Sequence, residues 1–494
     1  MPDVEAHSQS PTATLEPVAR DLPGLETRYF PPPGGTDVAA VSRRSTVEPI
    51  IDGEEYFDQL NTMIHSLNAG DAWYVTGWWF NPDFEFANNE KLGELLADRA
   101  ADGVDVRIII WTNRQLIDYP SLAGAFLAPL RGLAIANIKA AETLRGENSL
   151  QHRVLIDWSG NAASSHHMKV NVFSQGGDLT AFVGGIDYAD YRLASPPHDQ
   201  PGHFWHDAGV RVTGEAAERV LETVVTRWRE ATTLSLATYD IGDGTKDYNP
   251  APLALTPPVA GAALAESADT SIQVVRSFPD SKEFGFISNT RWDTLPRTGV
   301  HETKKTFQKM LGAALRYIYI EDQAFDAVDS LFPALVAACK RGVKVIAVLP
   351  GQPDPIDGTA PLPPVLSDEV RAGILKKLTA DEQKNLAVWQ LKGITVHSKL
   401  ILIDDELMSI GSANFMDRSM EFTFLGDDSE CSVVAVSTGD LVRDLRVSLW
   451  SEHLRVSGQE AELRNLESLG IWRPEWGTGV TFDHPDSQLL FVGP

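Results

Sequence analysis

Hydrophobic and polar positions follow two alternating periods along the chain, and these periods predict strands and helices in turn. The runs WYVTGWWF (73–80) and VDVRIIIW (104–111) have the length and the β-branched or aromatic content of buried strands. Between them, from about 90 to 101, apolar residues recur at helical spacing until Gly103 ends the pattern. Strands that alternate with helices predict β-α-β units, and hence an α/β protein with largely parallel sheets covered on both faces.

The second half of the chain repeats this order. The run YIYIEDQAF (317–325) corresponds to the strand at 73–80, and residues 331–350 correspond to the helix and strand at 94–111. Two amphipathic helices that begin with acidic residues and end near Trp form another matched pair, at 213–228 and 438–450. This internal repeat predicts two domains of similar fold, over residues 46–247 and 272–494.

Two segments fall outside the repeat. Residues 1–45 are rich in Pro, Ser and Thr and predict a disordered N-terminal arm. Residues 248–271 are rich in Pro and Ala, lack any period and predict a linker between the domains. With 494 residues the chain is too long for one hydrophobic core and long enough for two.

Composition narrows the function classes. The formal net charge of −26 argues against a nucleic-acid partner, because binding to phosphates calls for a basic surface. No apolar run approaches the ~20 residues of a membrane-spanning helix, and the N-terminus lacks the pattern of a signal peptide. We therefore expect a cytoplasmic protein, or one exported without a recognisable signal, that contacts membranes peripherally. The two cysteines, Cys339 and Cys431, exclude a disulfide framework.

The stretch VHSKLILIDDELMSIGSAN (396–414) carries the clearest chemical pattern. His397, Lys399 and Asp404 form H-x-K-x4-D, and the alternation in LILID places the histidine and the lysine on one face of a strand. Ser412 and Asn414 follow at a small-residue turn. An imidazole, an ammonium group and an amide donor near one point suit a phosphodiester, since one group attacks or protonates while the others hold the non-bridging oxygens.

A second, imperfect copy of this motif lies at 164–187. His167 and Lys169 keep the H-x-K spacing. The later positions change: Gly185 stands for Ser412, Asp187 for Asn414 and Ser174 for Asp404. Because the aspartate position is too far from the lysine to act at the same phosphorus, we expect Asp404 to be structural. Its loss in the first copy should then affect packing more than chemistry.

The paired motifs resemble the phospholipase D superfamily, in which two such motifs build one active site across a pseudo-twofold axis. The runs IGSANFMDRSM, AFVGGID, WHD (205–207) and YIEDQAF (319–325) resemble the catalytic core of eukaryotic-type phospholipases D, over residues 45–455. The resemblance implies two similar α/β/α sandwich domains with the active site at their interface. We expect a monomer.

The resemblance also implies roles, which spacing alone leaves open between the two histidines. His167 would be the nucleophile that forms a phosphohistidine intermediate, and His397 the general acid and later the base. Lys169 and Lys399 would balance charge on the phosphate oxygens. Before attack His167 should be neutral and His397 protonated, which requires different environments. The residues expected to bind phosphate are Asn414, Asp187, Ser412 and Gly185.

Each histidine should have a carboxylate that fixes its tautomer. In the family this partner follows the motif within the same half, which matches Asp207 to His167 and Glu430 to His397. Residues expected to support the site are His166, Glu321, Gln323 and Asp404. Between Glu321 and Gln323, Asp322 stands in place of the family's Asn. His198 and His206 are expected in loops or in supporting hydrogen bonds. Because side chains supply the charge balance, we expect that no cofactor is required. The sequence contains no further cluster that demands a metal. Dependence on divalent ions is left open.

The leading hypothesis is a phospholipase D that hydrolyses the distal phosphodiester of glycerophospholipids such as phosphatidylcholine, giving phosphatidic acid and a head-group alcohol. An alcohol in place of water would give transphosphatidylation. A nuclease or other phosphodiesterase is an alternative that the acidic charge disfavours. A cardiolipin or phosphatidylserine synthase is another, although the membrane spans common in cardiolipin synthases are absent from this sequence. A non-catalytic lipid-binding relative is the alternative from a different class.

Overall fold

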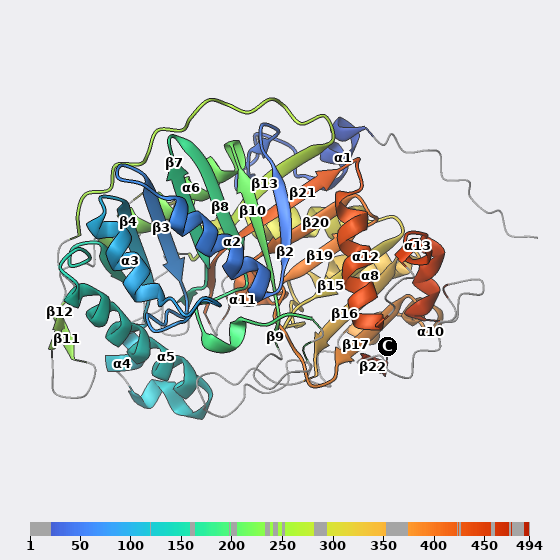
Figure 1. The fold of residues 1–494 in the computed structure, drawn as a ribbon. Helices are drawn as coiled ribbons and strands as arrows, with labels where there is room; N and C mark the ends of the chain where they lie inside the picture. The colour runs from blue at the N-terminus through green and yellow to red at the C-terminus, as the bar shows by residue number, and fades with distance from the viewer. Residues whose placement is uncertain are drawn as a thin grey trace, which may run out of the picture.

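The computed structural model describes most of the chain. It covers residues 21–118, 120–158, 164–196, 198, 205–232, 238–240, 246–248, 252–280, 294–351, 374–421, 423, 426–455, 460–473, 476 and 489–493. Figure 1 shows two sheets side by side, the first built mainly from the first half of the chain and the second mainly from the second half.

The first half forms a seven-stranded sheet in the order β2-β10-β8-β7-β3-β4-β5. The predicted strands at 73–80 and 104–111 are its β3 and β4, and every residue of β3 is buried. The strands are β2 (Val47–Ile51), β3 (Ala72–Gly77), β4 (Asp105–Trp111), β5 (Val154–Asp157), β7 (Val170–Gln175), β8 (Asp178–Gly184) and β10 (Ala208–Thr213).

The second sheet contains the same order in the equivalent strands, β13-β21-β20-β19-β15-β16-β17, with β1 (Val41–Ser42) and β22 (Leu489–Gly493) added at its edges. This one-to-one match confirms the internal repeat and the α/β class. The strands are β13 (Thr270–Phe278), β15 (Tyr317–Glu321), β16 (Lys344–Pro350), β17 (Leu386–Leu391), β19 (Leu400–Ile403), β20 (Leu407–Gly411) and β21 (Asp428–Ser437).

The prediction of largely parallel sheets is wrong. In the first sheet only β3, β4 and β5 run parallel to one another, and in the second only β15, β16 and β17 do. The other pairs within each repeat are antiparallel, because each H-x-K motif leads directly into a hairpin, β7–β8 or β19–β20. Such hairpins need only a short turn, whereas parallel neighbours need a crossover helix.

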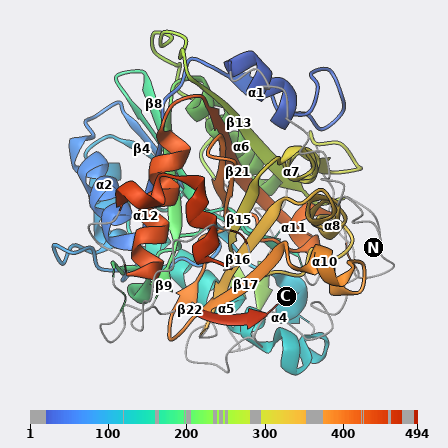
Figure 2. The same cartoon turned by 90° about the vertical axis from the view of Figure 1, so that its right-hand side faces the viewer.

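Helices cover both faces of each sheet, as expected for the α/β/α arrangement. On the outer face of the first sheet lie α2 (Gly53–Ser66), α3 (Leu92–Ala101) and α5 (Pro120–Gly146), and on that of the second lie α7 (Glu302–Ala313) and α8 (Phe332–Lys340). The matched helices α6 (Glu215–Thr232) and α12 (Leu441–Leu454) lie in a core that both sheets share. Figure 2 shows α7 and α8 on one side of the second sheet and α12 on the other.

The predicted disordered arm is wrong for residues 21–45. Helix α1 (Leu22–Tyr29) buries Leu25 and Tyr29 in the outer core of the second sheet, and β1 pairs with β13. The apolar positions of this short helix were hidden by the surrounding Pro and Thr residues. Residues 1–20 lie outside the described part of the chain.

The predicted linker, residues 248–271, forms no helix or strand from 252 to 269, but its bounds are too wide: Tyr248 ends β12 (Lys246–Tyr248) and β13 begins at Thr270. It runs along the first half: the amide of Leu253 donates to the carbonyl of His152 at 2.9 Å. In the described residues, no helix combines the length and hydropathy needed to cross a bilayer.

Candidate active site

Each H-x-K motif is held by a strand from the opposite half of the chain. Strand β6 (Ser165–His166) pairs in parallel with the start of β21, and β18 (Thr395–Val396) pairs in parallel with β9 (Trp205–His206). The backbone continues these pairings at the catalytic positions. The amide of His167 donates to the carbonyl of Ser429 at 3.0 Å, and that of His397 to the carbonyl of His206 at 2.7 Å.

As a result, each motif histidine contacts a carboxylate from the opposite half of the chain. His167 Nδ1 lies 3.2 Å from both carboxylate oxygens of Glu430, and His397 Nδ1 lies 2.8 Å from Asp207 Oδ2. The predicted pairing of Asp207 with His167 and of Glu430 with His397 is therefore wrong. The reason is the strand pairing between the halves. Strand β21 carries Glu430 and pairs with β6, next to His167. Strand β9 leads into Asp207 and pairs with β18, next to His397.

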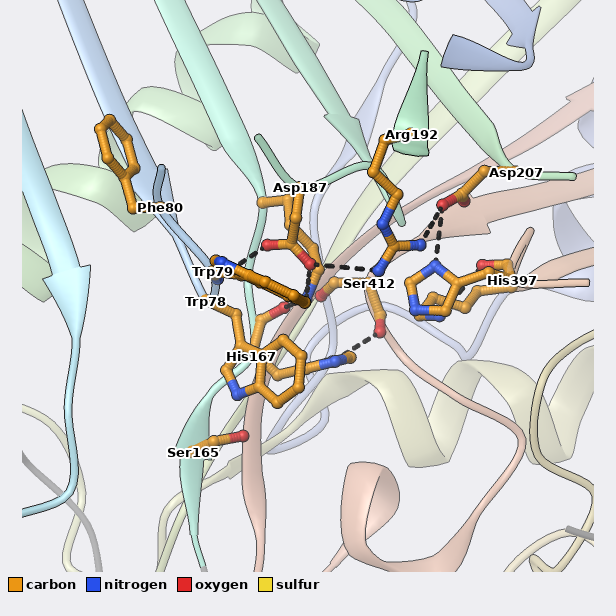
Figure 3. Close-up of polar contacts among 12 residues, drawn as sticks. Trp78, Trp79, Phe80, Ser165, His167, Asp187, Arg192, Asp207, His397 and Ser412 are labelled. Carbon is orange, nitrogen blue, oxygen red and sulfur yellow. Dashed lines mark hydrogen bonds and ion pairs between the residues drawn. The ribbon is translucent and has the colours of Figure 1, made fainter. Parts of the chain in front are cut away.

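The two lysines have matching positions. Lys169 Nζ donates to the carbonyl of His167 at 2.9 Å, and Lys399 Nζ donates to the carbonyl of His397 at 3.0 Å. Both side chains are buried, and burial lowers the pKa of Lys399 to about 8. Figure 3 shows the two imidazoles near one another, with Arg192 between Asp187 and Asp207. The structure therefore brings both predicted H-x-K pairs to one site.

The backbone carbonyl of Ser412 sets the tautomer of His167. Its Nδ1 lies 3.1 Å from the carbonyl oxygen of Ser412, which can only accept, so Nδ1 carries the proton when the ring is neutral. Burial and the charge of Lys169 hold the pKa of His167 well below its usual value. The free lone pair on Nε2 is what a nucleophile needs.

The expectation that His397 is already protonated does not hold for this arrangement. Burial and the nearby Arg192 and Lys399 lower its pKa well below the usual value, as for His167. Both imidazoles face the same group of cations, so their environments are alike. A negative phosphate would offset these cations and favour the protonated form of His397.

Two of the predicted phosphate ligands serve other purposes. The Ser412 hydroxyl donates to Glu430 at 2.5 Å and its amide donates to the carbonyl of Cys431. The Gly185 amide donates to the carbonyl of Ala208, and an added Cβ would lie 2.7 Å from the His397 carbonyl oxygen and closer still to Asp207. Both predictions are wrong, because these donors are already occupied.

Asp187 and Asn414 occupy equivalent positions but differ in their contacts. The carboxylate of Asp187 accepts from the Trp79 amide at 2.9 Å and lies 3.5 Å from Lys169 Nζ, so it pairs with the cation, and its predicted contact with phosphate is wrong. Asn414 Oδ1 is buried and has no hydrogen-bond partner among the described residues. Phosphate binding by Asn414 stays a prediction.

Asp404 lies at the far end of its hairpin, away from the histidines. Its carboxylate accepts from the amides of Leu315, Arg316 and Tyr317 at 2.7–2.8 Å, and so holds the turn before β15. In the first half the equivalent contact is made in the reverse direction. Asp71, in the loop before β3, accepts from the amide of Gly176 in the β7–β8 turn at 3.0 Å. Asp404 is structural, as expected from its spacing, and the prediction that it supports the site is wrong.

The remaining supporting positions lie close behind the site. His166 Nδ1 is 3.2 Å from Asp157, and burial lowers its pKa to about 4. Glu321 does not contact either motif histidine; it accepts from His206 Nε2 at 2.9 Å and from His453 Nε2 at 2.8 Å. Gln323 is partly buried, and its support of the site stays a prediction.

The sequence is similar to known proteins. Residues 307–449 match a family model described as cardiolipin synthase, PLD-like domain. The major cardiolipin synthase ClsA of Bacillus subtilis is 24% identical over 388 residues, covering 78% of this chain and 65% of that protein. Phospholipase D alpha 1 of Brassica oleracea is 22% identical over 538 residues, covering 82% of this chain and 64% of that protein. The chain thus spans less than two thirds of the length of either relative.

The fold is matched by a solved structure. The crystal structure of phosphatidylserine synthase from Haemophilus influenzae Rd KW20 superposes with a TM-score of 0.52 at 13% identity, covering 83% of this chain and 86% of that one. The chain is therefore similar to members of the phospholipase D superfamily in sequence and in fold. That the chemistry requires no cofactor stays a prediction.

The site includes Arg192, which the sequence did not single out. Arg192 is buried, with its guanidinium carbon 3.5 Å from the Trp205 ring centroid and its Nη1 3.2 Å from Asp207. Each motif histidine also packs edge-on against a tryptophan, His167 against Trp78 and His397 against Trp205, with ring centroids 5.2 Å apart in both. An arginine soon after the GGID run was the only cue in the sequence.

Proposed function

We propose that this chain belongs to the phospholipase D superfamily and transfers a phosphatidyl group from a glycerophospholipid to water or an alcohol. The crossed His167–Glu430 and His397–Asp207 pairs carry the proposal. They supply one neutral imidazole oriented for attack and a second that can exchange protons. The buried cations Lys169, Lys399 and Arg192 balance the charge of a phosphodiester.

In the first step His167 Nε2 attacks phosphorus and the P–O bond to the head group breaks. Lys169, Lys399 and Arg192 stabilise the charge that develops on the non-bridging oxygens. His397, which takes up a proton as the anionic substrate binds, donates it to the departing head-group oxygen. The products are the head-group alcohol and a phosphatidyl-histidine.

In the second step His397 acts as base. It removes the proton from water or an alcohol, whose oxygen attacks phosphorus as the P–N bond to His167 breaks. Water gives phosphatidic acid, and an alcohol gives a new phosphatidyl ester. Glu430 and Asp207 hold their imidazoles in the tautomers required throughout.

For the donor we keep phosphatidylcholine-like lipids, with hydrolysis and transphosphatidylation as paired outcomes. The cardiolipin synthases among the relatives favour a second candidate, transfer to phosphatidylglycerol to form cardiolipin. The two share every chemical step and differ in their substrates, because the second uses phosphatidylglycerol as both donor and acceptor. In either case the protein acts peripherally at a membrane surface and as a monomer, without a nucleic-acid substrate.

The test is a product panel with purified protein. Vesicles of phosphatidylcholine, with and without a primary alcohol, and vesicles of phosphatidylglycerol are compared with single-stranded DNA. Phosphatidic acid together with the phosphatidyl-alcohol supports the first candidate, and cardiolipin with free glycerol supports the second. Cleavage of DNA alone would replace both with a nuclease, and no product from any substrate would support a non-catalytic lipid-binding protein.

Variants assign the reaction to this site. His167→Ala and His397→Ala should each lower turnover by at least about 10³-fold. His65→Ala is the matched control, because His65 is an exposed histidine that pairs with Glu90 on the surface. If either motif variant kept activity at the level of the control, the histidine changed in that variant would be excluded from the mechanism.

A further inference from the structure

A second group of polar side chains lies behind the catalytic site. It consists of Asp52 before α2, His198, His206 on β9 and Glu452 on α12. We propose that these four residues bind one divalent transition-metal ion of the Zn²⁺ type, in a structural site that joins the two halves of the molecule. The proposal departs from the expectation of no metal site, and it does not rest on the phosphatidyl-transfer reaction.

The distances fit a four-coordinate ion. His198 Nε2 lies 3.1 Å from Asp52 Oδ2 and 3.0 Å from Glu452 Oε1. His206 Nδ1 lies 3.1 Å from Asp52 Oδ1 and 3.5 Å from Glu452 Oε1. Ligands about 2.0–2.1 Å from a tetrahedral Zn²⁺ are about 3.3–3.5 Å from one another. One ligand atom from each of the four residues lies within 4.8 Å of the other three, a grouping that can close around a single ion.

Two of these atoms are not satisfied by the protein itself. Asp52 Oδ2 and His206 Nδ1 have no hydrogen-bond partner of good geometry among the described residues, although Asp52 Oδ2 lies 3.1 Å from His198 Nε2 and His206 Nδ1 lies 3.1 Å from Asp52 Oδ1. Their residues are only 1% and 0% exposed, so bulk solvent does not reach them. Buried polar atoms without partners are costly. A cation at the centre would satisfy both.

The surroundings orient His206 as a metal ligand. Its Nε2 lies 2.9 Å from Glu321, which also accepts from the Tyr319 hydroxyl at 2.5 Å and from His453. Because Nε2–H donates to this carboxylate, Nδ1 of the neutral ring keeps its lone pair facing the cluster. Metal-binding histidines in proteins are commonly held by a carboxylate in this way.

Asp52 is likewise turned toward the cluster. It precedes α2 at φ 67°, and its side chain does not cap the helix. A non-glycine residue at this φ carries backbone strain that the surroundings must offset. Its Oδ1 accepts from the Asp207 amide at 3.1 Å, which leaves Oδ2 free to face the other ligands.

The charges also balance. Two carboxylates and two neutral imidazoles give a net charge of −2, which one divalent ion neutralises. Four protein ligands leave no open position for substrate, which is typical of a structural site. Three ligands come from the first half and Glu452 from the second, and β9 lies at the junction of the halves in Figure 1.

The proposed site adjoins the acid–base pair. The carbonyl of His206 accepts from the His397 amide, and the Asp207 amide donates to Asp52. An ion that fixes His206 and Asp52 would therefore also fix the backbone that presents Asp207 to His397. These four residues are positioning residues in this respect, because none touches the imidazole itself.

The test measures metal binding in the full-length protein. Protein stripped with a chelator should bind about one Zn²⁺ per chain on readdition, with a rise in melting temperature, and Co²⁺ should give the visible absorption of a four-coordinate site. His198→Ala should lower Zn²⁺ affinity by at least about 100-fold, and Glu321→Gln, through orientation alone, by about 10–100-fold. His65→Ala is again the control.

Glu452→Gln covers the case in which His198→Ala does not fold, since Glu452 lies on a helix with its side chain 16% exposed. It should fold and should also lose affinity. Stripped wild-type protein that binds neither ion and shows no change in melting temperature would overturn the proposal. So would full binding by both ligand variants. The cluster would then be a network of protonated histidines and carboxylates.

Discussion

Glu430 lies 3.2 Å from His167 Nδ1, although the two residues belong to opposite halves of the chain. The equivalent contact joins Asp207 to His397 at 2.8 Å. Neither half therefore contains a complete catalytic pair, and the site exists only when both halves have folded against each other.

The crossing predicts which step each carboxylate supports. Glu430→Gln should impair attack by His167, and Asp207→Asn should impair proton donation by His397, each lowering kcat on phospholipid by about 10²–10⁴. With a phosphodiester whose leaving group needs no proton, Asp207→Asn should still release the first product in a burst, while Glu430→Gln should not. Rapid-quench measurement of that burst distinguishes the crossed arrangement from pairing within each half. With pairing within each half, Glu430→Gln would show the burst and Asp207→Asn would not.

Gly185 leaves room for the acid–base pair. In Gly185→Ala the new methyl group would overlap the Asp207 carboxylate and the His397 carbonyl oxygen, so we expect a loss of kcat of at least about 10² with a folded protein. Gly312→Ala, in α7 with nothing within 4 Å of the added Cβ, is the control and should raise stability by about 0.5–1 kcal/mol. A Gly185→Ala enzyme with normal kcat would contradict this close packing.

Asp404 should contribute to stability and not to chemistry. Asp404→Ala leaves three backbone amides before β15 without their acceptor, and we expect the free energy of unfolding to fall by about 3 kcal/mol. The rate per folded molecule should be unchanged. Asp71→Ala, at the exposed equivalent contact, should cost less than about 1 kcal/mol. Urea denaturation and assays well below the unfolding midpoint test both parts.

The pH dependence follows from the lowered pKa of His167. Burial and Lys169 disfavour its protonated form, and the neutral form is the nucleophile, so activity should be lost only as pH falls below the usual histidine value of about 6.5. Asp428 raises this pKa, so Asp428→Asn should move the acidic limb of kcat/KM to still lower pH. A limb at or above 6.5 in the wild type would assign the titration to another group.

Much of this protein is determined by its sequence. The alternation of strands and helices, the duplication and the two H-x-K motifs depend on residues close together in the chain, where period and spacing reveal them. Even the structural role of Asp404 followed from its distance along the strand from Lys399.

Only the tertiary structure decided how the halves combine. The pairing of β6 with β21 and of β18 with β9 exchanges the carboxylates, places Arg192 between two acids and gathers Asp52, His198, His206 and Glu452. These contacts join residues far apart in the chain, and no local preference encodes them. They follow from the packing of two similar sheets around a shared core, which buries apolar surface and brings the motif strands together at the junction.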